Sequence, residues 1–502
     1  MALVWILGMV GCDPGEHREV LIVVNARSSI SVAIGDYYRL QRDIPARNVV
    51  SLGIELSDPG LGDEAQQTVS REDYRQKIHQ PIQRFLRERD LVEQIEIIVT
   101  TKGVPLRVSG PRVPVEDWLR DATMASVDAE LSLLFSPWEG SRGVADSANP
   151  YFDSSLAFRR FRRVHPNLPP HYLVARLTGY QSEVDPETGV PRDVKALIDA
   201  AQAKGEPGVW LIDEDPSLEP GLAAGNRVLL RPAAAALRQL GLDVYHDRDE
   251  TFVSDAASIR GYASWGSNDG HDAGPPTYGR IEGRRYPGSF TARALAVDFV
   301  STNARSFTHP PSYGQSLVAD LVRGGVAGAA GNVYEPALPG VPRPHILLRR
   351  YAQGVMAIEA FYRSIPYLGW TSVYIGDPLM QIAEPISRRD PDDLDGDGRL
   401  DREDNCVAIP NPRQRDTNGD GYGNLCDADI TNDGIVTTSW GDIFPITQRG
   451  DIEWIALAAK SHRYDPDSDL DGDGDVDEED LSIAQLSLFL RPGPSGVAIS
   501  SQ

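Results

Sequence analysis

An aspartate-rich pattern of 12 residues recurs four times between Asp393 and Asp480. The three most regular copies are DLDGDGRLDRED, DTNGDGYGNLCD and DLDGDGDVDEED, which begin at Asp393, Asp416 and Asp469. Each copy has oxygen-bearing side chains at positions 1, 3, 5, 9 and 12, and glycine at position 6. Ca²⁺ takes about six to eight oxygen ligands, and a short loop surrounds the ion by supplying them at alternate positions around a sharp glycine turn. The pattern therefore predicts a calcium site in each copy.

The remaining copy, DITNDGIVTTSWGD, begins at Asp429 and is less regular. Its twelfth position is Trp440, so we expect Asp442 to complete the site while two extra residues bulge out. Residues at position 7 act through their backbone carbonyls, and the four loops together predict three to four Ca²⁺ ions. With the loops numbered in chain order, the predicted ligands are Asp393, Asp395, Asp397, Arg399, Asp401 and Asp404 in loop one; Asp416, Asn418, Asp420, Tyr422, Asn424 and Asp427 in loop two; Asp429, Thr431, Asp433, Ile435, Thr437 and Asp442 in loop three; and Asp469, Asp471, Asp473, Asp475, Asp477 and Asp480 in loop four.

Charge divides the chain at the same place. Residues 390–502 contain 26 acidic and 8 basic residues, a net charge of −18 out of −24 for the whole chain. Negative charges at this density repel one another unless cations neutralise them. We therefore expect this tail to fold together with its metal. A disordered acidic linker is the alternative, and it does not explain why the loops share one spacing. The sequence contains no basic patch, which argues against a nucleic-acid partner.

The cysteines indicate an oxidising compartment. Cys406 follows loop one and Cys426 lies in loop two, so a disulfide between them would join the two loops. Two reduced, buried thiols are the alternative. Calcium loops of millimolar affinity also suit the outside of cells. We therefore expect a protein of the extracellular space, the bacterial cell surface or the periplasm.

The start of the chain supports export. Residues 2–11 are apolar and end in small residues before Cys12, as at the end of a signal peptide. The sequence MVGC is similar to a bacterial lipobox, which would make Cys12 a lipidated residue and the means of membrane attachment. Residues 1–12 are therefore interpreted as a signal-peptide remnant or lipoprotein signal. No Lys or Arg precedes the apolar run, and the run is too short to span a bilayer.

The body, residues 18–385, alternates short apolar runs with amphipathic stretches. Strands are predicted at 19–25, 48–52, 95–101, 172–177, 209–212 and 242–245, and helices at 30–42, 71–89, 193–204 and 226–240. This alternation predicts an α/β fold with a mainly parallel sheet sandwiched by helices. Residues 111–170 are rich in proline and are predicted to form an irregular insertion over the edge of the sheet or the strand tips.

Binding and active sites in open α/β sheets lie at the carboxyl ends of the strands. Three loops there carry suitable residues, SWGSNDGHD from Ser264, DFVSTNARSF from Asp298 and GVAGAAGNVYEP from Gly325, and VYIGDPLM follows farther on. The candidate catalytic residues in these loops are His271, Ser301 and Thr302. Glycine-rich turns that let a helix pack on a strand, and a solvated loop histidine, are the alternatives.

The body also resembles known proteins. The stretches VLIVVNARSSISVAIGDYYRLQRDIPARNVVSL and IEIIVTTKGVPLRV, with YASWGSND and GNVYEP, resemble an uncharacterised family of exported bacterial proteins associated with exosortase-type surface sorting systems. This resemblance covers most of residues 19–385. The order of a Ser-x-Gly turn, a strand ending near Ser301, the GVAGAAG strand and GDPLM is similar to gingipain-like cysteine peptidases, which implies a caspase-like fold.

The chain departs from that peptidase pattern at the residues that carry the chemistry. A caspase-like peptidase needs a cysteine thiolate as nucleophile and a histidine to handle its proton. In this chain the position of that histidine is occupied by Ser264 or Trp265, and no cysteine occurs between residues 13 and 405. Composition therefore excludes a cysteine peptidase. A serine-type hydrolase built on Ser301 or Thr302 would need a general base, and His271 is the candidate nearest in sequence.

The tail resembles two calcium-binding families. Residues 390–428, with DNC at 404–406, NPRQRD at 411–416 and CD at 426–427, resemble thrombospondin type 3 repeats. Residues 429–490, with the helix-like LSIAQLSLFL at 481–490, resemble a dockerin pair, and 491–502 form a flexible tail. The dockerin resemblance implies that each loop leads into a helix and that a cohesin-like or cell-surface protein is the partner. The long gap between loops three and four departs from a regular dockerin.

Two function classes remain open at this point. The first is an exported, calcium-binding surface or extracellular protein whose non-peptidase α/β body serves binding or assembly. The second is a secreted serine-type hydrolase with a calcium-binding anchoring module. A carbohydrate-active enzyme lacks support, because no pair of carboxylates stands out as acid and nucleophile.

Overall fold

The computed structural model describes residues 17–55, 67–110, 124–138, 148–180, 183–250, 252–266, 287–309, 311, 315–382, 390–438 and 449–497. The structural statements that follow concern these residues.

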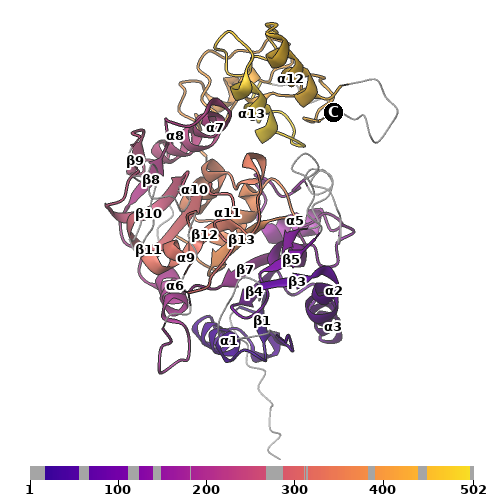
Figure 1. Cartoon of the computed structure of the whole chain (residues 1–502), viewed down its shortest axis with the longest axis vertical. Helices are drawn as coiled ribbons and strands as arrows, with labels where there is room; N and C mark the ends of the chain where they lie inside the picture. Colours follow the sequence, from indigo (N-terminus) through magenta and orange to yellow (C-terminus); the bar gives the residue numbers. More distant parts are fainter. Residues whose placement is uncertain are drawn as a thin grey trace, which may run out of the picture.

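A ten-stranded sheet runs through the body in the order β2-β1-β4-β7-β13-β12-β11-β10-β8-β9 (Figure 1). Its neighbouring strands are parallel except β12 and β13, which are antiparallel. Two parallel halves therefore run in opposite directions and meet at this pair. The predicted α/β class with a mainly parallel sheet is confirmed. The strands are β1 (Val20–Asn25), β2 (Val49–Leu52), β4 (Ile97–Thr101), β7 (Leu173–Leu177), β8 (Val209–Asp213), β9 (Val244–Asp247), β10 (Ala256–Ser264), β11 (Gly288–Asp298), β12 (Gly328–Asn332) and β13 (Ser372–Gly376).

Helices cover both faces of the sheet, which explains why its central strands are continuous apolar runs. Successive side chains of β1 point to opposite faces, so Val20 and Ile22 belong to one core while Leu21 and Val23 belong to another. Helix α1 contributes to the first core and α2, α3 and α4 to the second. The helices are α1 (Ser29–Gln41), α2 (Arg71–Tyr74), α3 (Gln80–Glu88), α4 (Val127–Ser132), α5 (Phe158–Val164), α6 (Arg192–Gln202), α7 (Pro220–Gly225), α8 (Arg231–Gln239), α9 (Val318–Gly324), α10 (Pro344–Ala352), α11 (Ala357–Ser364), α12 (Asp451–Ser461) and α13 (Glu478–Leu486).

The described part of the predicted irregular insertion, residues 111–170, contains regular elements. Strand β6 (Ala125–Ser126) joins β3 (Thr68–Ser70) and β5 (Arg107–Ser109) in a small second sheet. All residues of α4 are buried. Its Asp128 accepts hydrogen bonds from the guanidinium of Arg176 in β7 at 2.7 and 2.9 Å. The segment is thus bonded to the centre of the large sheet rather than laid over its edge.

The tail lies at one end of the molecule, beside α7 (Figure 1). The Sγ atoms of Cys406 and Cys426 are 2.02 Å apart, the distance of a disulfide bond. Apolar residues of the tail, among them Val436, Ile455 and Ile483, belong to the same core cluster as the body. Helix α13 begins earlier than predicted, because Asp477 caps it, and it ends at Leu486 instead of 490. None of the described helices combines the length and apolar character needed to cross a bilayer.

Replacing both Cys406 and Cys426 with serine is expected to lower the free energy of unfolding by about 3 kcal/mol, since the bond closes a loop of 20 residues in the unfolded chain. Urea denaturation of the full chain measures the change. Peptide mapping without reduction should recover the linked 406–426 peptide from protein purified under non-reducing conditions, and two free thiols in that protein would contradict the expectation.

Candidate metal centre

The four predicted loops share one backbone conformation. The glycine at position 6 has a positive φ in each, at 93° in Gly398, 92° in Gly421, 93° in Gly434 and 105° in Gly474. Residues with a Cβ rarely adopt this conformation, which explains the glycine at this position of the pattern. Loop three has the same turn as the others although its sequence is less regular.

Hydrogen bonds inside the loops orient the acidic side chains. In loop one, Oδ1 and Oδ2 of Asp393 accept from the backbone N–H groups of Gly396 and Gly398 at 2.8 and 3.2 Å. The carboxylate at position 5 accepts from the N–H group at position 7 in all four loops. These backbone hydrogen bonds therefore orient the carboxylates toward the turn by themselves.

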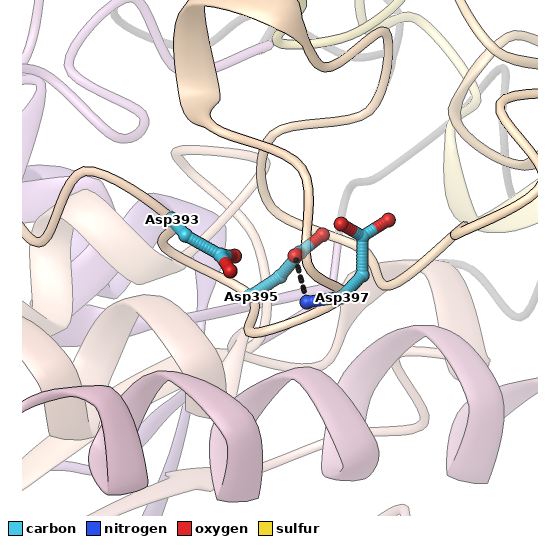
Figure 2. Close-up of side chains that lie close together, drawn as sticks. All are labelled: Asp393, Asp395 and Asp397. Atoms are coloured by element: carbon cyan, nitrogen blue, oxygen red, sulfur yellow. Dashed lines mark hydrogen bonds between the residues drawn. The ribbon is translucent and has the colours of Figure 1, made fainter.

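Loop one brings three of its predicted ligands together. One carboxylate oxygen from each of Asp393, Asp395 and Asp397 lies within 4.8 Å of the others. Figure 2 shows the three side chains close together on the loop. Asp395 is only 2% exposed. Its Oδ1 accepts from the backbone N–H of Asp397 at 3.1 Å, whereas its Oδ2 has no hydrogen-bond partner among the described residues. A buried carboxylate oxygen without a partner is costly, and a cation would satisfy it.

Burial and neighbouring carboxylates disfavour the charged form of several ligands. Burial, with the charges of Asp397 and Asp404, raises the pKa of Asp395 to about 8. Burial likewise raises the pKa of Asp427 to about 7 and that of Asp480 to about 6. Since a carboxylate in water has a pKa near 4, these groups lie where a cation would stabilise the charged form.

Loop two places its first carboxylate as loop one does, and the ninth residue of each loop accepts from the backbone N–H at position 2. The Asp416 carboxylate accepts from the N–H groups of Gly419 and Gly421 at 2.7 and 3.0 Å. The side chain of Asn424 accepts from the N–H of Thr417 and donates to the backbone carbonyl of Pro466. Asn424 therefore ties loop two to the segment before loop four.

Loop three is bonded to a carboxylate that is not among its predicted ligands. Asp451, the first residue of α12, is fully buried and accepts from the N–H groups of Thr431 at 2.8 Å and Thr437 at 2.7 Å. In loop four, Asp480 similarly accepts from the N–H groups at positions 3 and 9. Asp451 thus makes in loop three the contacts that Asp480 makes in loop four. The predicted ligand Asp442 lies outside the described residues. The sequence signal that could have identified Asp451 is the apolar helical pattern that begins there, since a similar pattern begins at the end of loop four.

Loop four forms the second cluster in which three acidic residues, Asp469, Asp471 and Asp473, lie within 4.8 Å of one another. Two arginines reach it from other parts of the chain. Arg415 lies 3.0 Å from Oδ2 of Asp469, and Arg227 of the body lies 3.0 Å from Oδ2 of Asp471. The other oxygen of each carboxylate, Oδ1, accepts from a backbone N–H of the loop, that of Gly472 for Asp469 and that of Asp473 for Asp471.

The candidate loops at the strand ends of the body do not all lie at the same end of the sheet. Strands β10, β11 and β12 are parallel, so the loops that follow Ser264, Asp298 and Asn332 share one edge. GDPLM follows β13, which runs the other way, and lies at the opposite edge. There Asp377 accepts from the Tyr38 hydroxyl at 2.7 Å and from Arg42 Nε at 2.7 Å.

The candidate hydroxyls contact an amide. Gln315 donates to Ser301 Oγ at 3.2 Å and accepts from the Thr302 hydroxyl. An amide does not take up a proton at neutral pH, so this contact provides no general base. His271 lies outside the described residues. Nearby, Asn303 donates to Oδ1 of Asp298 at 2.6 Å, a buried contact that fixes the loop after β11.

Comparisons with protein-family models, with curated protein sequences and with solved structures find no match to this chain.

Proposed function

We propose that the chain is an exported calcium-binding protein of the extracellular space or the bacterial cell surface, with a non-peptidase α/β body that serves binding or assembly. The observation that carries the calcium assignment is Asp395, a carboxylate 2% exposed whose Oδ2 has no partner among the described residues. Asp393 and Asp397 stand beside it and add negative charge. A hard divalent cation is the ligand that satisfies such a set of oxygens.

The arrangement after loops three and four supports a dockerin-like module at 429–490, next to thrombospondin type 3-like repeats at 390–428. Helix α12 begins with Asp451 at loop three, and α13 contains Asp480 of loop four. Each loop therefore ends in a carboxylate from the first turn of a helix. The disulfide between Cys406 and Cys426 supports export, because such bonds persist in oxidising compartments.

Calorimetric titration of the chelator-treated full chain tests the metal assignment. We expect three to four Ca²⁺ ions per chain, from the four loops of the sequence. Mg²⁺ should substitute poorly, because it demands a tight octahedral shell that these loops do not impose. A chain that binds no calcium, or binds magnesium equally well, would contradict the proposal.

A separate prediction concerns loop three. Asp451→Ala should remove one Ca²⁺ ion from the titration, because it deletes a fully buried carboxylate that closes the loop. Glu453→Ala, which removes a charge from the same helical turn but is not buried, is the matched control. Loss of an ion in the control, or none in Asp451→Ala, would show that Asp451 does not complete this site.

The non-peptidase part of the proposal rests on the contacts of Ser301 and Thr302. Purified protein should show no hydrolysis of peptides or esters above buffer, and Ser301→Ala and Thr302→Ala should change nothing. If the protein does hydrolyse them and His271→Ala reduces the rate about a hundredfold or more, the serine-type hydrolase is correct instead.

A further inference from the structure

Helix α13, which follows loop four, is held at both ends by the body. Near its start, Arg227 Nε donates to Oε1 of Glu479 at 2.8 Å. At its end, the buried Arg343 donates to the carbonyl of Leu486 at 2.7 Å. The hydroxyl of Tyr367 donates to the carbonyl of Leu488 at 2.7 Å. The last carbonyls of a helix lack partners within it, and here Arg343 of the body supplies one for Leu486, while Tyr367 bonds the chain just beyond the helix.

One face of α13 is packed against the body. Ile483, Ala484 and Leu486 are buried in the core cluster that includes Val228 and Leu229. Helix α13 contacts α7, whose sequence PGLAAG is made largely of small residues. A Cβ placed on Gly221 would lie 3.3 Å from the hydroxyl of Ser482. The two helices therefore approach closely because α7 lacks bulky side chains at this contact.

Loop four and the docked helix share one arginine. The Arg227 guanidinium contacts Asp471, a predicted calcium ligand, at 3.0 Å and also contacts Glu479 of α13. Bonds of this kind orient metal ligands, and their loss usually weakens metal binding. Loop four contains six aspartates, so it stays negative after binding one Ca²⁺ ion and continues to attract the arginine.

We propose that the body is itself the binding partner of α13, and that a Ca²⁺ ion in loop four and the docking of α13 stabilise each other through Arg227. This inference rests on the calcium binding proposed above. Calcium fixes the loop from which α13 starts, and the docked body holds Asp471 and Glu479 in place. Coupling of this kind is reciprocal, so a contact that favours docking also raises calcium affinity. An outside partner for this face of α13 would have to displace the body.

A cross-linking experiment on the full chain tests the docking. Gly221→Cys and Ser482→Cys are introduced together with Cys12→Ser, and oxidation to a 221–482 disulfide is followed by peptide mapping. Cross-linking should be rapid in millimolar calcium and at least about tenfold slower in chelator. Failure to cross-link in calcium would overturn the docking, and equal rates with and without calcium would overturn the coupling.

Arg227→Gln in the same background tests the role of the arginine. The calcium concentration that gives half the maximal cross-linking rate should rise about tenfold. Arg192→Gln is the matched control, since Arg192 forms an exposed ion pair with Glu183 on the surface of the body. An unchanged midpoint in Arg227→Gln would overturn the coupling through this residue.

Calorimetry on the cross-linking variant separates this inference from the proposed function. If calcium does not bind at all, the proposed function fails and the inference fails with it. If three to four ions bind while the cross-linking rate ignores them, only the inference fails.

Discussion

Removal of the proposed calcium ions from the 502-residue chain with a chelator is expected to lower its free energy of unfolding by about 8 kcal/mol. Each of three filled sites contributes about 2.7 kcal/mol when calcium is present at a hundred times its Kd. The physical cause is the crowding of carboxylates such as Asp395 and Asp480, which are buried close to other negative charges. Without the ions these groups repel one another and favour the open tail.

Urea denaturation followed by circular dichroism, with and without calcium, measures this effect. Asp469→Ala combined with Asp480→Ala should remove one ion and about a third of the stabilisation, and it should loosen α13. Asp475→Asn is the control, because position 7 contributes its backbone carbonyl and needs no particular side chain. Unfolding curves that are the same in calcium and in chelator would leave the tail without a metal-dependent fold.

The second large effect is expected in the body. Asp128→Ala should lower the free energy of unfolding by about 3–5 kcal/mol, because it leaves the buried guanidinium of Arg176 without its counter-charge. Both side chains of this pair are 2% exposed. Arg176 also donates to the carbonyls of Val104 and Pro105, so it cannot turn to water without breaking the loop after β4.

Thermal or urea unfolding in calcium measures this loss. Glu183→Ala is the control, since its ion pair with Arg192 is exposed and should contribute less than about 1 kcal/mol. The double variant Asp128→Leu with Arg176→Met should recover much of the lost stability, because it buries no charge. A loss as small in Asp128→Ala as in the control would show that α4 does not depend on this pair.

Local patterns predicted the parts of the molecule that are built from neighbours in sequence. The buried run of β1 and the amphipathic pattern of α1 predicted those elements within one or two residues, because each reflects how nearby side chains face one core. The glycine turns of the four acidic loops were predicted for the same reason. Their residues act at alternate positions around a turn that Gly398 and its counterparts allow.

Tertiary structure decided what joins distant segments. Asp451 lies outside the 12-residue pattern and bonds to loop three because α12 folds back to it. The proline-rich segment contains α4, a short helix. It is stabilised by the ion pair between Asp128 and Arg176, so its sequence shows no amphipathic pattern from which it could be predicted.

The sequence by itself determined the α/β class, the acidic loops and the absence of cysteine from the body, since composition, spacing and periodicity carry these directly. Only the tertiary structure decided that β13 is antiparallel to β12, which places GDPLM at the opposite end of the sheet from the loops after β10 and β11. It alone also brought Arg227 to Asp471, over 244 residues of chain. Such contacts depend on how elements pack, and no local pattern of residues records that choice.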